Sequence, residues 1–261
     1  MEFAEWADMG ETTGRALGIG EAEWETRVNV AALYRLVAHY GWDDMVSGHI
    51  SARLPGHDDR FLLNPYGMHF EEITASSLVV VGFDGEQVGE SEHTFNRAGF
   101  TIHSAVHMNR RDALYVVHLH TNYGVAVACQ AQGLLPLNQT SLGVYSELAY
   151  HEYEGAAQNL EERERLARDL GDKNAMILRN HGTLACGPNA GGAWQVIFRL
   201  ERACEYQILA LAGGAELVFP GEEVVESRRG LSSTETLKTR GGYIWPALLR
   251  KLDRIDPSYR C

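Results

Sequence analysis

The sequence contains few cysteines, and their spacing excludes a metal or redox motif built from them. Its 261 residues include four cysteines, at positions 129, 186, 204 and 261. No two of them have the Cys-x-x-Cys spacing that zinc ribbons and thioredoxin-like sites require. We therefore expect free thiols in a reducing cytoplasm.

Long hydrophobic runs and an excess of positive charge are also absent. No apolar run approaches the roughly 20 residues of a membrane-spanning helix, and the N-terminus lacks the basic start of a signal peptide. The chain has 23 Lys and Arg against 35 Asp and Glu, which gives a formal net charge of −12. This balance argues against nucleic acid or an anionic membrane as a partner. We expect a cytoplasmic protein that binds a small molecule.

Stretches rich in proline or serine, which would link two domains, are missing as well. At 261 residues the chain is near the upper size for a single hydrophobic core. We expect one domain over residues 21–215, an N-terminal extension at 1–20 and a C-terminal extension at 216–261. Residues 216–240 are polar and irregular, but 243–249 are too apolar for solvent. The C-terminal segment is expected either at a subunit interface or folded onto its own domain.

The chain does contain alternating helix and strand patterns. Apolar residues recur at helical spacing, or suit a helix, over 22–40, 96–108, 123–129, 160–170 and 197–211. Short apolar or alternating runs predict strands at 49–54, 61–64, 78–83, 113–117 and 175–178. Together they predict an α/β fold in which helices cover both faces of one sheet.

Two histidines at the end of a predicted strand suggest a metal site. Side chains at i and i+2 of a strand share one face, so His118 and His120 can present two imidazoles to one ion. His181, which follows the apolar run 175–178, can supply a third. Three protein ligands leave a coordination position open, as in catalytic sites. On spacing alone, a chance His-x-His among eleven histidines is an equal alternative.

Six short segments occur in the order typical of a known family. They are Ser-Gly-His-Ile-Ser at 47–51, Phe-Leu-Leu-Asn-Pro-Tyr-Gly at 61–67, Glu-Ile-Thr-Ala-Ser-Ser-Leu at 72–78, Asn-Arg-Ala-Gly-Phe at 96–100, Val-Val-His-Leu-His at 116–120 and Arg-Asn-His-Gly at 179–182. On these segments, the chain resembles the class II aldolase/adducin family from about residue 23 to about residue 214. Residues 98–105 are typical of its adducin-like branch.

This resemblance has implications for fold, assembly and cofactor. It implies a three-layer α/β/α fold with a mostly antiparallel central sheet, and a homotetramer with active sites between subunits. It also implies a divalent metal held by three histidines that match His118, His120 and His181. Zinc is the usual metal of the family, and we consider manganese and iron(II) as alternatives.

The sequence departs from the sugar-phosphate aldolases of the family at their acid/base glutamate. Counted back from His118 without a gap, that glutamate falls on Gly99. An inserted loop would be needed to bring Glu92 into its place. The candidate proton carriers are therefore Glu92, His49 and Tyr66.

The phosphate-binding positions are altered too. The asparagine of the family's Gly-Asn-x-Ser motif is His49, after Gly48, and a serine before Gly67 is Tyr66. A phosphate needs several small donors converging on it, so these changes argue against a sugar-phosphate substrate. These four residues are expected to bind a carboxylate or an aromatic ring, while His49 and Tyr66 have an alternative role as turn residues packed under the sheet.

Other histidines have less specific interpretations. His103 and His107 are spaced i, i+4 and share one helix face, so they could form a second metal pair. Helix packing and hydrogen bonding behind the metal site are the favoured interpretation, and His103 matches a family histidine. His151 receives no role from the sequence.

We interpret the chain as a metal-dependent carbon–carbon lyase, of aldolase or decarboxylase type, acting on a small carbonyl or carboxylate substrate. An open-sided metal stabilises the negative charge that develops when a carbon–carbon bond breaks beside it. One alternative is a non-heme iron oxygenase that cleaves a hydroxy or keto acid. The other is a non-catalytic binding protein like adducin, which has the fold and is a cytoskeletal scaffold.

Overall fold

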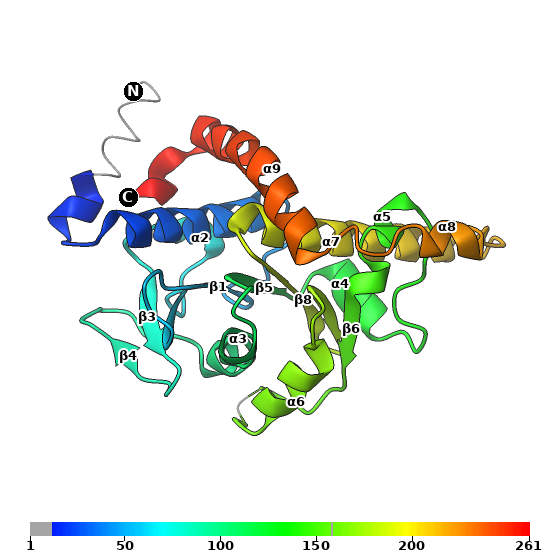
Figure 1. Ribbon diagram of the computed structural model, residues 1–261, viewed down its shortest axis with the longest axis horizontal. Helices are drawn as coiled ribbons and strands as arrows, with labels where there is room; N and C mark the ends of the chain where they lie inside the picture. Colours follow the sequence, from blue (N-terminus) through cyan, green and yellow to red (C-terminus); the bar gives the residue numbers. More distant parts are fainter. Residues whose placement is uncertain (1–11, 158) are drawn as a thin grey trace.

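A mixed β-sheet runs through the centre of the protein (Figure 1). The computed structural model describes residues 12–157 and 159–261, and within them the sheet has eight strands in the order β4-β3-β2-β1-β5-β8-β7-β6. Their bounds are β1 His49–Arg53, β2 Arg60–Leu63, β3 Val79–Gly82, β4 Gln87–Val88, β5 Tyr115–Leu119, β6 Leu148–His151, β7 Ala175–Leu178 and β8 Gly182–Gly187. Neighbours are antiparallel except β6 and β7, which are parallel. The predicted, mostly antiparallel sheet is confirmed.

Helices cover both faces of this sheet. The α-helices that the described residues form are α2 Glu21–His39, α3 Arg97–Asn109, α4 Asn122–Ala128, α5 Gln139–Leu142, α6 Glu162–Leu170, α7 Ala190–Ala212, α8 Glu222–Glu226 and α9 Thr234–Ile255, with short 3₁₀ turns η1 Phe70–Glu72, η2 Tyr145–Glu147 and η3 Pro257–Arg260. Helices α2 and α7 pack on one face, and α3 and α6 on the other (Figure 1). The three-layer α/β/α arrangement is therefore confirmed.

Strand β5 shows how the sequence produces these layers. Val117 and Leu119 point into the core under α2 and α7, whereas Val116 belongs to the core under α3 and α6. Because both faces of the strand are buried, it reads as a continuous apolar run rather than an alternating one. His118 shares a face with Val116 and so lies on the α3 side of the sheet.

The C-terminal segment forms more regular structure than its composition suggests. Residues 216–240, expected to be irregular, contain α8 and the first turns of α9, where the Ser233 side chain accepts a hydrogen bond from the Thr236 N–H. Helix α9 packs along α7, with Leu237 and Leu252 buried in the main core. The apolar residues near 245 therefore have partners within the same chain.

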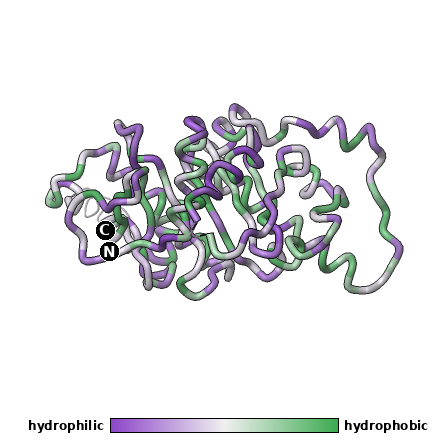
Figure 2. The backbone as a smooth tube through the Cα atoms, turned by 90° about the horizontal axis from the view of Figure 1, so that it is seen from below, coloured by the Kyte–Doolittle hydropathy of each residue, from purple (hydrophilic) through white to green (hydrophobic). Residues whose placement is uncertain are grey.

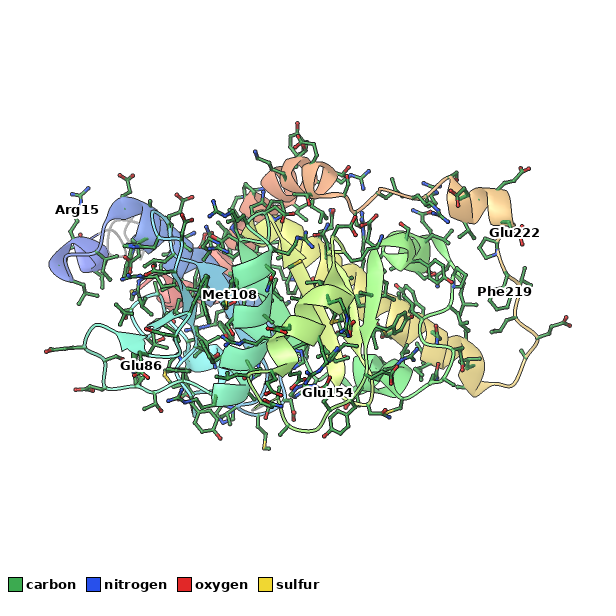
Figure 3. All side chains as sticks on the ribbon, turned by 60° about the horizontal axis from the view of Figure 1, so that its bottom comes forward. Arg15, Glu86, Met108, Glu154, Phe219 and Glu222 are labelled. Carbon is green, nitrogen blue, oxygen red and sulfur yellow. The ribbon has the colours of Figure 1, made fainter. Side chains whose placement is uncertain are left out.

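A loop between α7 and α8 projects from the body of the protein (Figures 2 and 3). Its tip carries Val218, which is 88% exposed, and Phe219, which is 50% exposed. Of the N-terminal extension expected at 1–20, residues 1–11 lie outside the described part of the chain. Over that part, no helix is both long and apolar enough to cross a membrane.

Candidate metal centre

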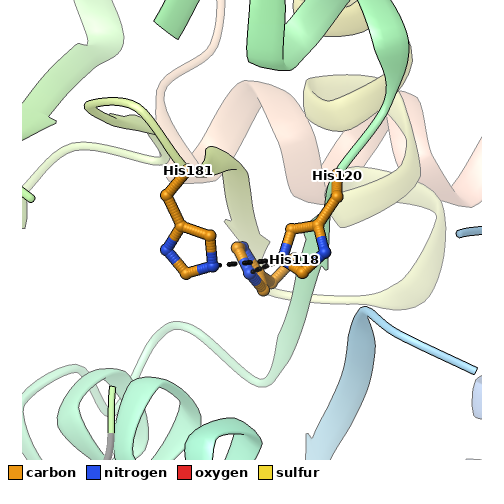
Figure 4. Close-up of side chains that lie close together, drawn as sticks. All are labelled: His118, His120 and His181. Carbon is orange, nitrogen blue, oxygen red and sulfur yellow. Dashed lines mark hydrogen bonds between the residues drawn. The ribbon is translucent and has the colours of Figure 1, made fainter. Parts of the chain in front are cut away.

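Three imidazoles meet where β5 ends beside the turn between β7 and β8 (Figure 4). His118 and His120 project from one face of β5 and its end, and the neighbouring strand β8 starts just after His181. The Nε2 atom of His120 lies 2.9 Å from Nε2 of His118 and 3.1 Å from Nε2 of His181. The structure thus brings together the three histidines that the sequence predicted as ligands.

Hydrogen bonds at the far side of two rings define their tautomers. The Nδ1–H of His118 donates to the Thr183 carbonyl at 2.9 Å, and Nδ1–H of His120 faces the Asp44 carboxylate at 3.3 Å. Each Nε2 then carries a lone pair, and two lone pairs 2.9 Å apart repel each other unless a cation lies between them. Zinc at about 2.0–2.1 Å from tetrahedral nitrogen ligands separates them by roughly 3.3 Å. The donor set therefore fits a divalent metal.

Backbone geometry at the β7–β8 turn aims His181 at the other two rings. Asn180 has a φ of +56°, in the left-handed region that asparagine tolerates, and its N–H donates to the Ala128 carbonyl at 3.1 Å. A Cβ atom at Gly182 would collide with the Leu119 carbonyl oxygen. The Arg-Asn-His-Gly segment thus combines a left-handed turn with a close approach between backbones.

Burial keeps His118 and His181 neutral. His118 is fully buried, and desolvation, followed by the neighbouring imidazoles, holds its pKa well below the usual range. Desolvation and then His120 lower the pKa of His181 to about 4. Neutral imidazole is the form that binds metal, so both rings are available as ligands at physiological pH. His120 and His181 are only half-buried, which leaves the centre accessible to solvent on their side.

His49 fills the space next to this centre. It lies opposite His118 in the β1–β5 register, and the two rings stack with centroids 5.5 Å apart and planes 20° apart. A Cβ at Gly99 would stand 2.7 Å from Cδ2 of His49. The imidazole therefore occupies the room that a side chain at position 99 would need. Its Nδ1 atom is buried and has no hydrogen-bond partner among the described residues.

A buried polar cluster lies behind His49 on the α3 side. The Ser51 hydroxyl is 2.5 Å from Nδ1 of His103 and 2.7 Å from Nε2 of His107. The His103 ring makes an edge contact with the His49 ring. Desolvation, then the charge of Arg53, lowers the pKa of His107 to about 3. This geometry agrees with packing and hydrogen bonding behind the centre, as favoured for this pair.

The remaining predicted site residues take different positions. Gly48 has a φ of +86° and approaches the His118 carbonyl oxygen so closely that a Cβ would lie 3.2 Å from it. Tyr66 is 56% exposed, Gly67 has a φ of +93° with open space around it, and Glu92 is exposed in the loop between β4 and α3. Throughout 12–157 and 159–261, no hydrogen bond or ion pair joins Tyr66 or Glu92 to the three histidines.

Glu201 lies beside the candidate centre, and no sequence motif indicated it. It is buried on α7 and accepts hydrogen bonds from the hydroxyls of Thr121 and Thr183. Thr121 directly follows His120, and the Thr183 carbonyl holds His118, so this carboxyl links two ligand-bearing segments. In the helix predicted at 197–211, it falls on the same face as the apolar residues Ile197, Cys204 and Ile208. That position is the feature of the sequence that indicates its burial.

Comparison with known proteins places this architecture in a family. The family model described as "Class II Aldolase and Adducin N-terminal domain" matches residues 28–208. A Caulobacter vibrioides protein, whose name places it in aldolase class 2, is 54% identical over 92% of this chain and 94% of its own length. Rat alpha-adducin is 38% identical over 88% of this chain, which spans 33% of the adducin.

Solved structures agree with this assignment. An aldolase II superfamily protein from Pseudomonas syringae superposes with a TM-score of 0.87 at 46% identity, covering 93% of this chain and 98% of the other. The L-fuculose 1-phosphate aldolase of Glaciozyma antarctica gives a TM-score of 0.79 at 26% identity, with coverages of 92% and 93%. By its sequence match, its relatives and its fold, the chain belongs to the class II aldolase/adducin family.

Proposed function

We propose that this protein is a metal-dependent carbon–carbon lyase, of aldolase or decarboxylase type, with His118, His120 and His181 as metal ligands. The observation that carries the proposal is the pair of bare Nε2 atoms of His118 and His120, 2.9 Å apart with both Nδ1–H groups already engaged. The similarity to a fuculose-phosphate aldolase supports the same reaction class. Zinc is the proposed metal, with manganese or iron(II) as alternatives.

The surroundings of the centre favour a substrate other than a sugar phosphate. His49 stands where the phosphate motif has asparagine, and its ring excludes a side chain at Gly99, the position of the family's acid/base glutamate. Both changes remove groups that sugar-phosphate cleavage uses. We propose a small carbonyl or carboxylate substrate, such as a keto or hydroxy acid, bound near Gly48, His49, Tyr66 and Gly67.

The residues around the centre divide the chemistry between them. A bound divalent metal supplies Lewis acidity for the charge that develops on a carbonyl oxygen. Thr183 and Glu201 keep the ligands oriented, and the unpaired Nδ1 of His49 is the proposed proton carrier. Tyr66 and Glu92 are the alternative proton carriers because their exposed side chains are open to a substrate arriving from solvent.

We further propose a cytoplasmic homotetramer with the 216–261 segment at subunit contacts. The exposed apolar tip of the loop after α7 supports this arrangement, because Val218 is largely exposed and Phe219 is half-exposed. The four cysteines are free thiols, as expected in a reducing compartment.

Metal analysis tests the proposal directly. Protein purified without added metal should contain about one zinc or manganese per chain, because three imidazoles form the protein donor set of a catalytic zinc site. His118→Ala should lose nearly all of it, whereas His57→Ala, at an exposed histidine, should keep it. Circular dichroism checks that each variant is folded.

The same measurement can contradict the proposal. Iron in place of zinc, with oxygen uptake in the presence of keto acids, would favour the oxygenase alternative. Absence of metal from the wild type, even after metal is supplied, would favour the non-catalytic role suggested by the adducin relatives. With metal present, His49→Asn, Tyr66→Phe and Glu92→Gln identify the proton carrier by the loss of turnover on a keto or hydroxy acid.

A further inference from the structure

A cleft of about 990 Å³ lies between α5, α7 and α9, and its lining includes no residue of the histidine centre. Four of the residues that line it are arginines, and none is a carboxylate. The arginines are Arg199, Arg202, Arg228 and Arg240. In a chain with a net charge of −12, this is a local concentration of the opposite sign, and such clefts attract anions.

Three of these arginines have no carboxylate partner in the described chain. Arg202 forms an ion pair with Glu205 at 2.5 Å, but no ion pair joins Arg199, Arg228 or Arg240 to any acidic residue across 12–157 and 159–261. Burial, and then the positive charge of Arg240, lower the pKa of Arg199. Charges of one sign held together in a partly buried site are costly unless an anion binds them.

Two buried polar atoms on α7 lack partners at the same place. Within the part of the chain that the structure describes, Nη1 of Arg199 has no acceptor and Oε1 of Gln195 has no donor, although both atoms are shielded from solvent. The two residues are one helical turn apart, so their side chains lie on the same face of α7 and line the same cleft. Buried polar groups are almost always hydrogen-bonded, so this pair points to a ligand that accepts from one and donates to the other.

The same wall of the cleft is aromatic. Tyr40, Trp194 and Phe198 line it, with the Trp194 ring 5.5 Å from Tyr40 and 5.9 Å from Phe198 between centroids. The planes of neighbouring rings are tilted by 44° and 42°, and aromatic side chains in such arrangements pack against planar rings in offset or edge-to-face contacts. The volume falls within the range of clefts that bind small molecules.

We propose that this cleft binds a small organic anion, with a planar aromatic or heteroaromatic body and a carboxylate or phosphate group. Arg199 and Arg240 hold the anionic group, the partly exposed rings of Tyr40 and Phe198 contact the planar body, and Oε1 of Gln195 accepts a hydrogen bond from the ligand. This site is separate from the histidine centre and does not depend on the function proposed for it.

Isothermal titration calorimetry on the full-length protein tests this proposal with two probes, adenosine monophosphate and 4-hydroxybenzoate. At least one should bind once per chain with a Kd below about 1 mM, and the stronger of the two identifies phosphate or carboxylate as the preferred anion. Arg199→Gln and Arg240→Gln should weaken binding by about tenfold or more, the usual effect of losing a charged hydrogen bond. Arg111→Gln, at an arginine that is 85% exposed, is the matched control and should bind like the wild type.

His118→Ala separates this cleft from the histidine centre, because a probe bound in the cleft keeps its affinity in that variant. Loss of binding in His118→Ala, equal affinities in Arg199→Gln and Arg111→Gln, or no binding of either probe to the wild type would each overturn the proposal. So would sedimentation showing that Arg199→Gln dissociates an oligomer while neither probe binds, since the arginines would then belong to a subunit contact. Circular dichroism establishes that the glutamine variants fold.

Discussion

Gly99→Ala should lower the free energy of unfolding of the metal-free protein by about 1–3 kcal/mol, the usual cost of overpacking a filled core. The added Cβ would lie 2.7 Å from Cδ2 of His49. The His49 side chain projects from β1 toward α3, is buried, and stacks against His118. At an unhindered helical position, the same substitution stabilises by about 1 kcal/mol. Denaturant unfolding measures the difference.

The size of the effect should depend on His49. In a His49→Ala background both the Cδ2 and the Cγ atoms that the new Cβ would meet are gone, so Gly99→Ala should become neutral or stabilising, and the double-mutant cycle should give a coupling energy of about 2 kcal/mol or more. Gly242→Ala is the matched control, since Gly242 is also inside a helix but has open space where its Cβ would be. If Gly99→Ala stabilised the protein as much as Gly242→Ala, the result would contradict a steric clash between residue 99 and His49.

Glu201→Gln should remove a pH dependence from the stability of the metal-free protein. Burial raises the pKa of Glu201 to about 7, against the opposing hydrogen bonds from Thr121 and Thr183. Below its usual pKa of 4.5 the group is protonated in both the folded and unfolded states. As the pH rises toward 7 only the unfolded state ionises, so the free energy of unfolding falls. The total decrease is about 3 kcal/mol and is complete above the pKa of the folded state.

The measurement compares the two proteins at several pH values. The difference in unfolding free energy between wild type and Glu201→Gln should change by about 3 kcal/mol between pH 4.5 and 7.5. The wild type should become less stable relative to the variant as the pH rises. Taking the difference cancels the titration of the histidines, which both proteins share. Parallel pH curves would show that Glu201 titrates at its ordinary pKa and would contradict the assignment.

The sequence predicted the layers where a helix or strand carries its own local pattern, but strands β4, β6 and β8 of the described sheet were not predicted. Apolar spacing located α2, α3 and β5 to within one or two residues, and the alternation of a strand predicted that His118 and His120 share a face. Their meeting with His181 depends on β5 and β8 being neighbours, which no local pattern shows; only the family resemblance implied that the three histidines share one site. Metal binding by this triad stays a prediction.

Other features of the centre depend on contacts between distant segments. No local pattern reveals that Gly99 of α3 faces His49 of β1, so the missing glutamate and the added histidine looked like two separate departures. Glu201 was overlooked because a single acidic residue in an amphipathic helix is normally placed in solvent. Its burial depends on hydroxyls that come from Thr121 and Thr183, about 80 and 18 residues away.

The two edge strands of the central sheet limit how copies of this protein can associate. One edge strand, β4, has only two residues, and the other, β6, has four and is joined to β7 in the parallel sense. Edges this short offer few free N–H and C=O groups to a strand from another molecule. Growth into fibres by strand addition is therefore disfavoured, and stable association must use helix and loop surfaces, which can close into an assembly of fixed size.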